Sequence, residues 1–104
     1  MKSDRIKMLE QFVAEDPTDP FNRYALALEL AKWDKLKSKE IFDQLIQANP
    51  DYVPAYYQAA LVYLELSLNE GATKIVENGI VQARKQNNSK AERELRGLMD
   101  ETDI

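Results

Sequence analysis

The sequence predicts an all-α fold of about six short antiparallel helices, and two observations support this prediction. Apolar residues recur three and four residues apart along most of the chain, which is the spacing of one helix face. The four prolines, Pro17, Pro20, Pro50 and Pro54, form two pairs that separate these segments, and proline is tolerated at helix starts but not in helix interiors. No stretch sustains the alternation of β-branched residues that is typical of strands, so strands are not expected.

The first two helices have clear boundary signals. The first is expected over residues 3–15, where the Ser3 hydroxyl can cap free backbone amides and Asp16-Pro17 ends the helix. Asp19 is expected to cap the second helix. Pro20 then falls in the first turn, where a missing backbone amide costs nothing.

The remaining helices follow from similar punctuation. A third helix is expected after a turn near Asp34, and Asn49-Pro50 stops it. Three further helices are expected at about 53–68, 69–87 and 89–101. The last of these is mostly charged, and a charged outer face is what the terminal helix of a stacked array requires.

Composition limits both the size of the core and the class of partner. A chain of 104 residues with 44% hydrophobic residues is long enough for one domain with a modest core. Its 14 basic and 18 acidic residues are mixed along the chain and give a net charge of −4. Nucleic acids and membrane surfaces are therefore not expected partners, because binding to them requires a positive excess. No apolar run approaches the roughly 20 residues of a membrane span, and a cytoplasmic location is expected.

Catalysis is not expected, because the chain has neither cysteine nor histidine. Their absence removes thiolate nucleophiles, the commonest metal ligands and the commonest general acid or base at neutral pH. None of the four serines lies in a Gly-x-Ser-x-Gly turn, and the three glycines are too far apart to form a phosphate-binding loop. We therefore expect no catalytic residues, no metal site and no cofactor.

An internal repeat organises the middle of the chain. A shift of 33 residues places Asp16-Pro17 on Asn49-Pro50, Tyr24 on Tyr57 and Leu28 on Leu61. The helices that follow match better at 34 residues, which places Ser38 on Ala72, Ile41 on Ile75, Phe42 on Val76 and Leu45 on Gly79. A period of this length predicts stacked helical hairpins, with a one-residue slip in the turn between the two helices of a hairpin.

The second copy carries small and large residues at fixed offsets, namely Tyr56, Ala59, Ala60, Tyr63, Ala72, Val76 and Gly79. This pattern resembles the tetratricopeptide repeat (TPR) family, in particular small bacterial-type proteins with two repeats and capping helices. The resemblance implies antiparallel helix-turn-helix units in a right-handed superhelix. It divides the single domain, residues 1–104, into a half-repeat helix (4–16), two repeats (19–50 and 53–87) and a capping helix (89–102). Ser38 and Ser67 depart from the alanine and the turn glycine of the family pattern.

The resemblance also implies a function and a site. In this family the inner helices line a concave groove, so the chain is expected to be a non-catalytic scaffold that binds a peptide or a partner helix there. The corresponding groove positions are Tyr24, Leu28 and Lys32 in the first repeat and Tyr57, Leu61 and Glu65 in the second. The alternative is that the end helices fold over the groove, which would make these residues ordinary core.

A second hypothesis for function is self-association. Leu9, Phe12 and Val13 on the first helix form an incomplete interface, which another copy could cover in a homodimer. The sequence does not identify any other protein or peptide partner.

Trp33 is the only tryptophan and lies among lysines 32, 35, 37 and 39. It has two interpretations. One is a small basic patch suited to an acidic partner, and the other, which we favour, is an anchor ring packed over a solvated turn.

Overall fold

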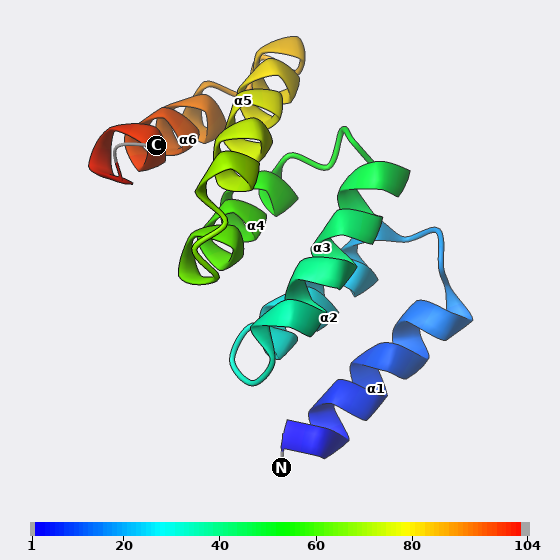
Figure 1. The fold of residues 1–104 in the computed structure, drawn as a ribbon. Coiled ribbons are helices and arrows are strands. Elements are labelled where there is room, and N and C mark those ends of the chain that lie inside the picture. Colours follow the sequence, from blue (N-terminus) through cyan, green and yellow to red (C-terminus); the bar gives the residue numbers. More distant parts are fainter. Residues whose placement is uncertain (1, 103–104) are drawn as a thin grey trace.

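A computed structural model describes residues 2–102, with side chains from Asp4 onward, as six helices in antiparallel order (Figure 1). They are α1 (Lys2–Glu15), α2 (Pro20–Leu30), α3 (Lys35–Ala48), α4 (Pro54–Glu65), α5 (Asn69–Lys85) and α6 (Ser89–Thr102). The described residues contain no strand, which confirms the predicted all-α class. The molecule measures 37 × 28 × 19 Å.

Side-chain caps start three of the helices. The Oδ1 atoms of Asp19, Asp34 and Asn88 accept hydrogen bonds from backbone amides two or three residues later, at 3.0, 3.1 and 3.1 Å. These caps satisfy amides that have no partner within the helix. The first helix begins at Lys2, one residue before the start predicted at Ser3. The predicted capping by the Ser3 side chain lies outside the described side chains.

Helix α4 ends at Glu65, three residues before the end predicted at Leu68. The chain reverses at Ser67, whose φ of 61° lies in the left-handed region, and the Leu68 amide donates to the Tyr63 carbonyl at 2.8 Å. This turn closes the helix in the way that usually employs glycine. The length of the helix was overestimated because Leu66 and Leu68 continue the apolar spacing of α4, although the backbone already turns at Ser67.

Replacing Ser67 with glycine should raise the free energy of unfolding by about 0.5–1 kcal/mol. Glycine relieves the left-handed strain, although it also gains conformational freedom in the unfolded chain. Urea denaturation followed by circular dichroism measures the change. Ser67→Ala is the control, since alanine keeps the strain and should bring no gain. An equal gain in both variants would contradict this account.

The helices pair in sequence, and each pair packs on the next. Helix α2 packs on α3, and α4 packs on α5, which gives two hairpins. Helix α3 also contacts α4 and so joins the two hairpins. At the ends of the array, α1 packs on α2 and α6 packs on α5. In Figure 1, α3 and α5 lie in front of α2 and α4. Helix α6 contacts both α5 and α4, so α2, α4 and α6 belong to one layer of the array.

The core consists of three clusters at the joints of the array. One joins α2, α3 and α4, the second joins α4, α5 and α6, and the third joins α1 to α2. The two repeats bury equivalent positions: Leu26 and Ala59 are both buried, and so are Phe42 and Val76. The burial pattern therefore follows the shift of 33 residues in the inner helices and 34 in the outer ones.

Small residues permit the close approach of neighbouring helices. Ser38 is fully buried, and its hydroxyl donates a hydrogen bond to the Ala27 carbonyl at 2.7 Å. This bond lets serine take a buried position where the family pattern has alanine. The Asn78-Gly79 dipeptide is typical of hairpin turns, but here it lies inside α5. At Gly79 a Cβ atom would lie 2.7 Å from the Cβ of Tyr56 on α4.

Candidate interaction groove

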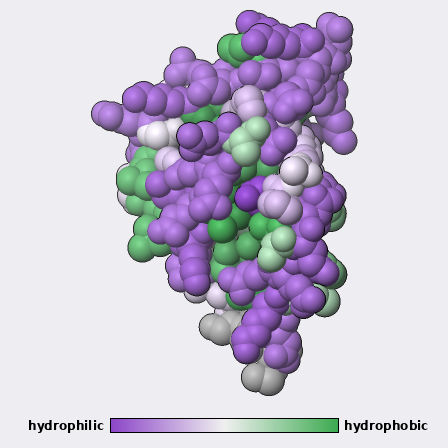
Figure 2. Space-filling view, turned by 90° about the vertical axis from the view of Figure 1, so that its right-hand side faces the viewer, coloured by the Kyte–Doolittle hydropathy of each residue, from purple (hydrophilic) through white to green (hydrophobic). Residues whose placement is uncertain are grey.

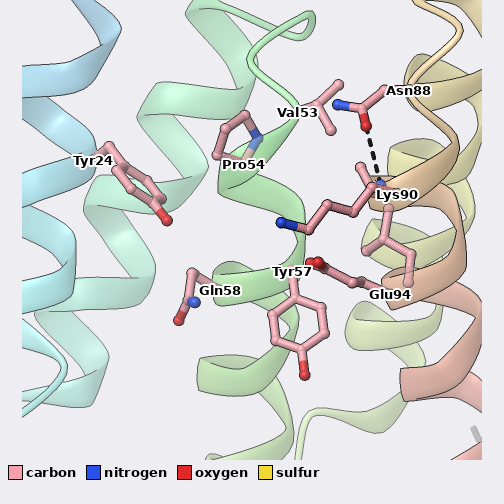
Figure 3. Close-up of a pocket in the computed structure, with 10 residues that line it drawn as sticks. Tyr24, Val53, Pro54, Tyr57, Gln58, Asn88, Lys90 and Glu94 are labelled. Carbon is pink, nitrogen blue, oxygen red and sulfur yellow. Dashed lines mark hydrogen bonds between the residues drawn. The ribbon is translucent and has the colours of Figure 1, made fainter.

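The inner helices α2, α4 and α6 line a hollow of about 240 Å³ that is open to solvent (Figure 3). Proline at the start of α4 and the Asn88 cap of α6 place the first turns of these helices around it. The side chains that define the hollow include Tyr24 from α2, Pro54, Tyr57 and Gln58 from α4, and Lys90 and Glu94 from α6. Its lining thus combines aromatic rings with polar groups, as ligand sites commonly do.

A second hollow, of about 490 Å³, runs along α2. Phe21, Tyr24, Ala25 and Leu28 form its apolar part, and Arg5 from α1 with Glu29 and Lys32 from α2 form its charged part. Tyr24 borders both hollows. The two hollows thus meet at this side chain, and we refer to them together as the groove.

The structure brings four of the six predicted site residues to this groove. Tyr24, Leu28 and Lys32 line the second hollow, and Tyr57 lines the first. Leu61 lines neither hollow and packs against the cluster that joins α4, α5 and α6. Glu65 lines neither hollow, and its carboxylate pairs with the Lys35 ammonium at 3.4 Å.

The tyrosine on α2 belongs to the groove and to the core at once. The Tyr24 ring meets Phe42 and Tyr52 edge to face, with centroid separations of 6.4 and 5.6 Å. Burial accordingly raises the pKa of Tyr24. Its ring therefore packs on the cluster between the first and second hairpins while it lines the groove. Phe21, one turn earlier, is 59% exposed and belongs to none of the three core clusters.

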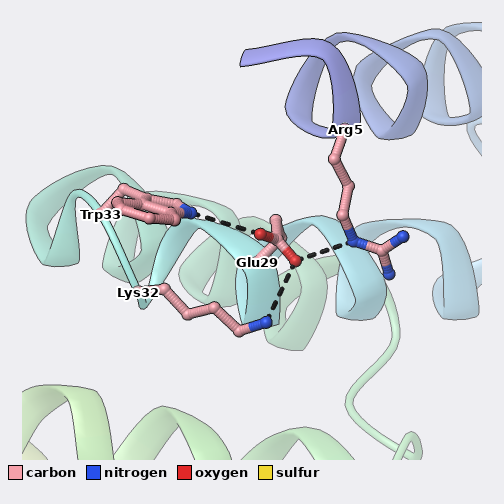
Figure 4. Close-up of polar contacts among 4 residues, drawn as sticks. All are labelled: Arg5, Glu29, Lys32 and Trp33. Carbon is pink, nitrogen blue, oxygen red and sulfur yellow. Dashed lines mark hydrogen bonds and ion pairs between the residues drawn. The ribbon is translucent and has the colours of Figure 1, made fainter. Parts of the chain in front are cut away.

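A charged cluster that sequence reasoning missed lies at the α1 end of the groove (Figure 4). The Glu29 carboxylate is almost buried, and its Oε1 atom accepts from Arg5 Nε at 2.8 Å and from Lys32 Nζ at 3.3 Å. Its Oε2 atom accepts from Trp33 Nε1 at 3.2 Å. These bonds, the one from Arg5 first, hold the pKa of Glu29 below its ordinary value. One signal could have revealed this cluster, since Glu29 lies three residues after Leu26, which is buried, and so on the same face of α2.

Stability should depend on pH through Glu29. A carboxylate whose pKa is lowered by folding stabilises the folded state above its unfolded pKa of 4.5, and this contribution is lost as the pH falls through the folded value. Glu29→Gln should therefore melt at a lower temperature than wild type at pH 7, and the gap should narrow as the pH falls below about 4.5. Thermal denaturation from pH 7 to about pH 3 measures this. A gap that is constant with pH would contradict the ionic role.

Comparison with known proteins identifies the fold family. No protein-family model and no curated protein matches the chain. A solution structure of a tetratricopeptide repeat domain protein from Salinibacter ruber is 37% identical with a TM-score of 0.75, over 80% of this chain and 85% of that one. The chain belongs to the tetratricopeptide repeat family. The resemblance inferred from the offsets of Tyr56, Ala72 and Gly79 is thereby confirmed.

Two further structures resemble this TPR chain. A crystal structure of a tetratricopeptide repeat domain protein from Salinibacter ruber is 35% identical with a TM-score of 0.73, over 80% of this chain and 97% of that one. The crystal structure of MamA is 20% identical with a TM-score of 0.69, over 97% of this chain and 70% of that one, and it shares the fold. TPR domains are in general protein-interaction scaffolds.

Carboxylates pair with most of the lysines around Trp33 in this TPR chain. Trp33 is 54% exposed, and its indole Nε1–H donates a hydrogen bond to Glu29. Three of the four neighbouring lysines are paired: Lys32 with Glu29 at 3.3 Å, Lys35 with Glu65 at 3.4 Å, and Lys39 with Asp43 at 3.0 Å. These pairs neutralise much of the local positive charge.

Residues 2–102 contain no group of three or more acidic, histidine or cysteine side chains placed to hold a metal ion. None of the helices described is long and apolar enough to cross a membrane.

Proposed function

We propose that this TPR chain is a non-catalytic module that binds a peptide segment of a partner protein in the groove of α2, α4 and α6. The observation that carries the proposal is a pair of hollows that share Tyr24, one lined from α2, α4 and α6 and the other from α1 and α2. The absence of cysteine and histidine from the sequence supports a binding role over a catalytic one. A cytoplasmic location remains a prediction.

Exposed aromatic surface in the groove supports the same proposal. Phe21 and Tyr57 can supply large contact areas with few rotatable bonds, which keeps the entropy cost of binding low. Phe21 is 59% exposed beside Leu28 and Ala25. A ligand side chain that covered Phe21 would therefore gain hydrophobic stabilisation without unfolding any of the described core.

Selection from a random-peptide phage-display library tests this function. Peptides selected on wild type should bind Phe21→Ser at least about tenfold more weakly, since a buried aromatic contact is worth more than 1.4 kcal/mol. Leu36→Ser is the matched control, because Leu36 is 64% exposed on α3 and lines neither hollow. It should change affinity less than about twofold. Circular dichroism checks that both variants fold. Failure to select any peptide that distinguishes the two variants would refute the proposal.

A homodimer through α1 is the second candidate. Of the three residues predicted for this interface, Leu9 is buried and Val13 packs beside it in the cluster that joins α1 to α2, so these two cannot contact another copy. Phe12 remains exposed, together with Met8. Figure 2, which looks onto the side of the molecule at the right of Figure 1, shows hydrophobic surface among hydrophilic residues on that side. If this candidate holds, sedimentation equilibrium should give a mass that rises with concentration in wild type and stays monomeric in Phe12→Ser. A monomer at all concentrations would leave peptide binding as the sole proposal.

A further inference from the structure

We propose that the groove selects peptides in which an acidic side chain lies close to an apolar one, and that Arg5 and Lys32 bind the acidic group. This inference rests on the proposed function and specifies the chemistry of its ligand. The two cations come from different helices, α1 and α2, and both line the hollow that also contains Phe21 and Leu28. Their position is set by their common partner, Glu29.

Both cations keep donor capacity for a ligand. Arg5 uses its Nε–H on Glu29, and a guanidinium has five N–H donors in all. Figure 4 shows the terminal nitrogens of Arg5 directed away from Glu29. Lys32 has three N–H donors, and the structure gives it one acceptor among the described residues. The two side chains are 59% and 65% exposed, so a ligand carboxylate can reach them.

Glu29 orients these cations without cancelling them. Its two oxygens accept three hydrogen bonds, and the side chain is only 8% exposed, so it remains an ionised, nearly saturated acceptor. Two positive charges against one negative charge leave a net charge of +1 at this end of the groove. In the other hollow, Lys90 and Glu94 balance each other. Among the described lining residues, the net charge of the groove is therefore concentrated beside Arg5 and Lys32.

This local charge complements an acidic residue of a peptide. A carboxylate that bridges a guanidinium and an ammonium forms charge-assisted hydrogen bonds, which are about twice as strong as neutral ones. Phe21, Ala25 and Leu28 continue the same hollow and suit an apolar neighbour of that residue. The net charge of the whole chain is −4 and repels acidic peptides at long range. Enrichment of acidic peptides would therefore report local recognition rather than non-specific attraction.

The experiment is the same phage selection, with a charge-reversal variant added. Peptides selected on wild type should carry aspartate or glutamate at a constant separation from an apolar residue. A synthetic copy of the most enriched peptide should bind Lys32→Glu at least about tenfold more weakly than wild type. Lys74→Glu on α5 is the matched control, since it makes the same change in net charge at an exposed site away from both hollows. It should change affinity less than about twofold.

A charge swap makes the test specific. Replacing the acidic residue of the synthetic peptide with lysine should weaken binding to wild type and restore binding to Lys32→Glu. Lys32→Gln removes the charge without reversing it, and should weaken the original peptide less than Lys32→Glu does. Because Lys32 is mostly exposed, circular dichroism should show all of these variants folded.

The outcomes separate this inference from the function on which it rests. Selected peptides that lose affinity for Phe21→Ser but carry no enriched acidic residue would overturn the inference and leave groove binding intact. Equal affinity for Lys32→Glu and Lys74→Glu would do the same. Selection of no groove-dependent peptide would overturn both. Self-association of the chain that Lys32→Glu abolishes would show that the occupant is a second copy and would also overturn the inference.

Discussion

Replacing Phe42 with alanine should lower the free energy of unfolding by about 3–5 kcal/mol. Phe42 has no exposed surface, and its cluster joins α2, α3 and α4. Tyr24 meets its ring edge to face. The substitution would remove apolar contacts and leave a cavity that three packed helices cannot collapse to fill. Domains of this size are stable by about 5–15 kcal/mol, so the loss would be a large share of the total.

Urea denaturation followed by circular dichroism measures this loss. Leu36→Ala on the same helix is the control, because Leu36 is mostly exposed and its truncation should change stability by less than about 0.5 kcal/mol. Phe42→Ala should also bind groove peptides more weakly than wild type, since the Tyr24 ring packs against Phe42. Similar losses in both variants would show that this cluster does not hold the two hairpins together.

Replacing Gly79 with alanine should lower the free energy of unfolding by about 1–3 kcal/mol, although alanine is the better helix former. The new Cβ atom would lie 2.7 Å from the Cβ of Tyr56 and 3.0 Å from Cδ1 of Leu95. The Cβ of Tyr56 is fixed to the backbone of α4, so α5 would have to move away. This movement would disturb the cluster that joins α4, α5 and α6. Thermal and urea denaturation measure the effect.

Gly97→Ala is the matched comparison and should have the opposite sign. Gly97 lies inside α6, and a Cβ atom there would meet no atom within 4 Å in the described structure. Alanine should therefore raise the free energy of unfolding by about 0.5–1 kcal/mol through helix propensity alone. Two substitutions of the same chemistry would then differ only in whether another helix is close. A stabilising effect at Gly79 would contradict the close packing of α4 and α5.

The proposed ligand depends on α1 as well as on the inner helices. Arg5 reaches the groove only because α1 packs against α2 through Leu9, Leu26 and Leu30. A change that loosens this cluster should therefore weaken binding of acidic peptides even if the groove itself is intact. The first helix thus contributes a ligand contact in addition to covering one end of the core.

Local sequence signals determined much of the fold. The caps Asp19 and Asp34 and the prolines mark helix ends because their effects depend on backbone groups within one turn. The repeat register was also visible, since Phe42 and Val76 fill equivalent buried sites in the two hairpins and both must be apolar. The four groove residues Tyr24, Leu28, Lys32 and Tyr57 followed from that register through the family resemblance.

Only the tertiary structure decided which of these side chains face solvent and which charges meet. Arg5 and Glu29 are 24 residues apart, and no helical period relates them. Their contact depends on the angle at which α1 crosses α2. Likewise, Leu61 and Glu65 are at the repeat positions equivalent to Leu28 and Lys32, but they line neither hollow. Periodicity assigns a residue to a face of its own helix, whereas burial and charge pairing depend on which neighbouring helix packs on that face.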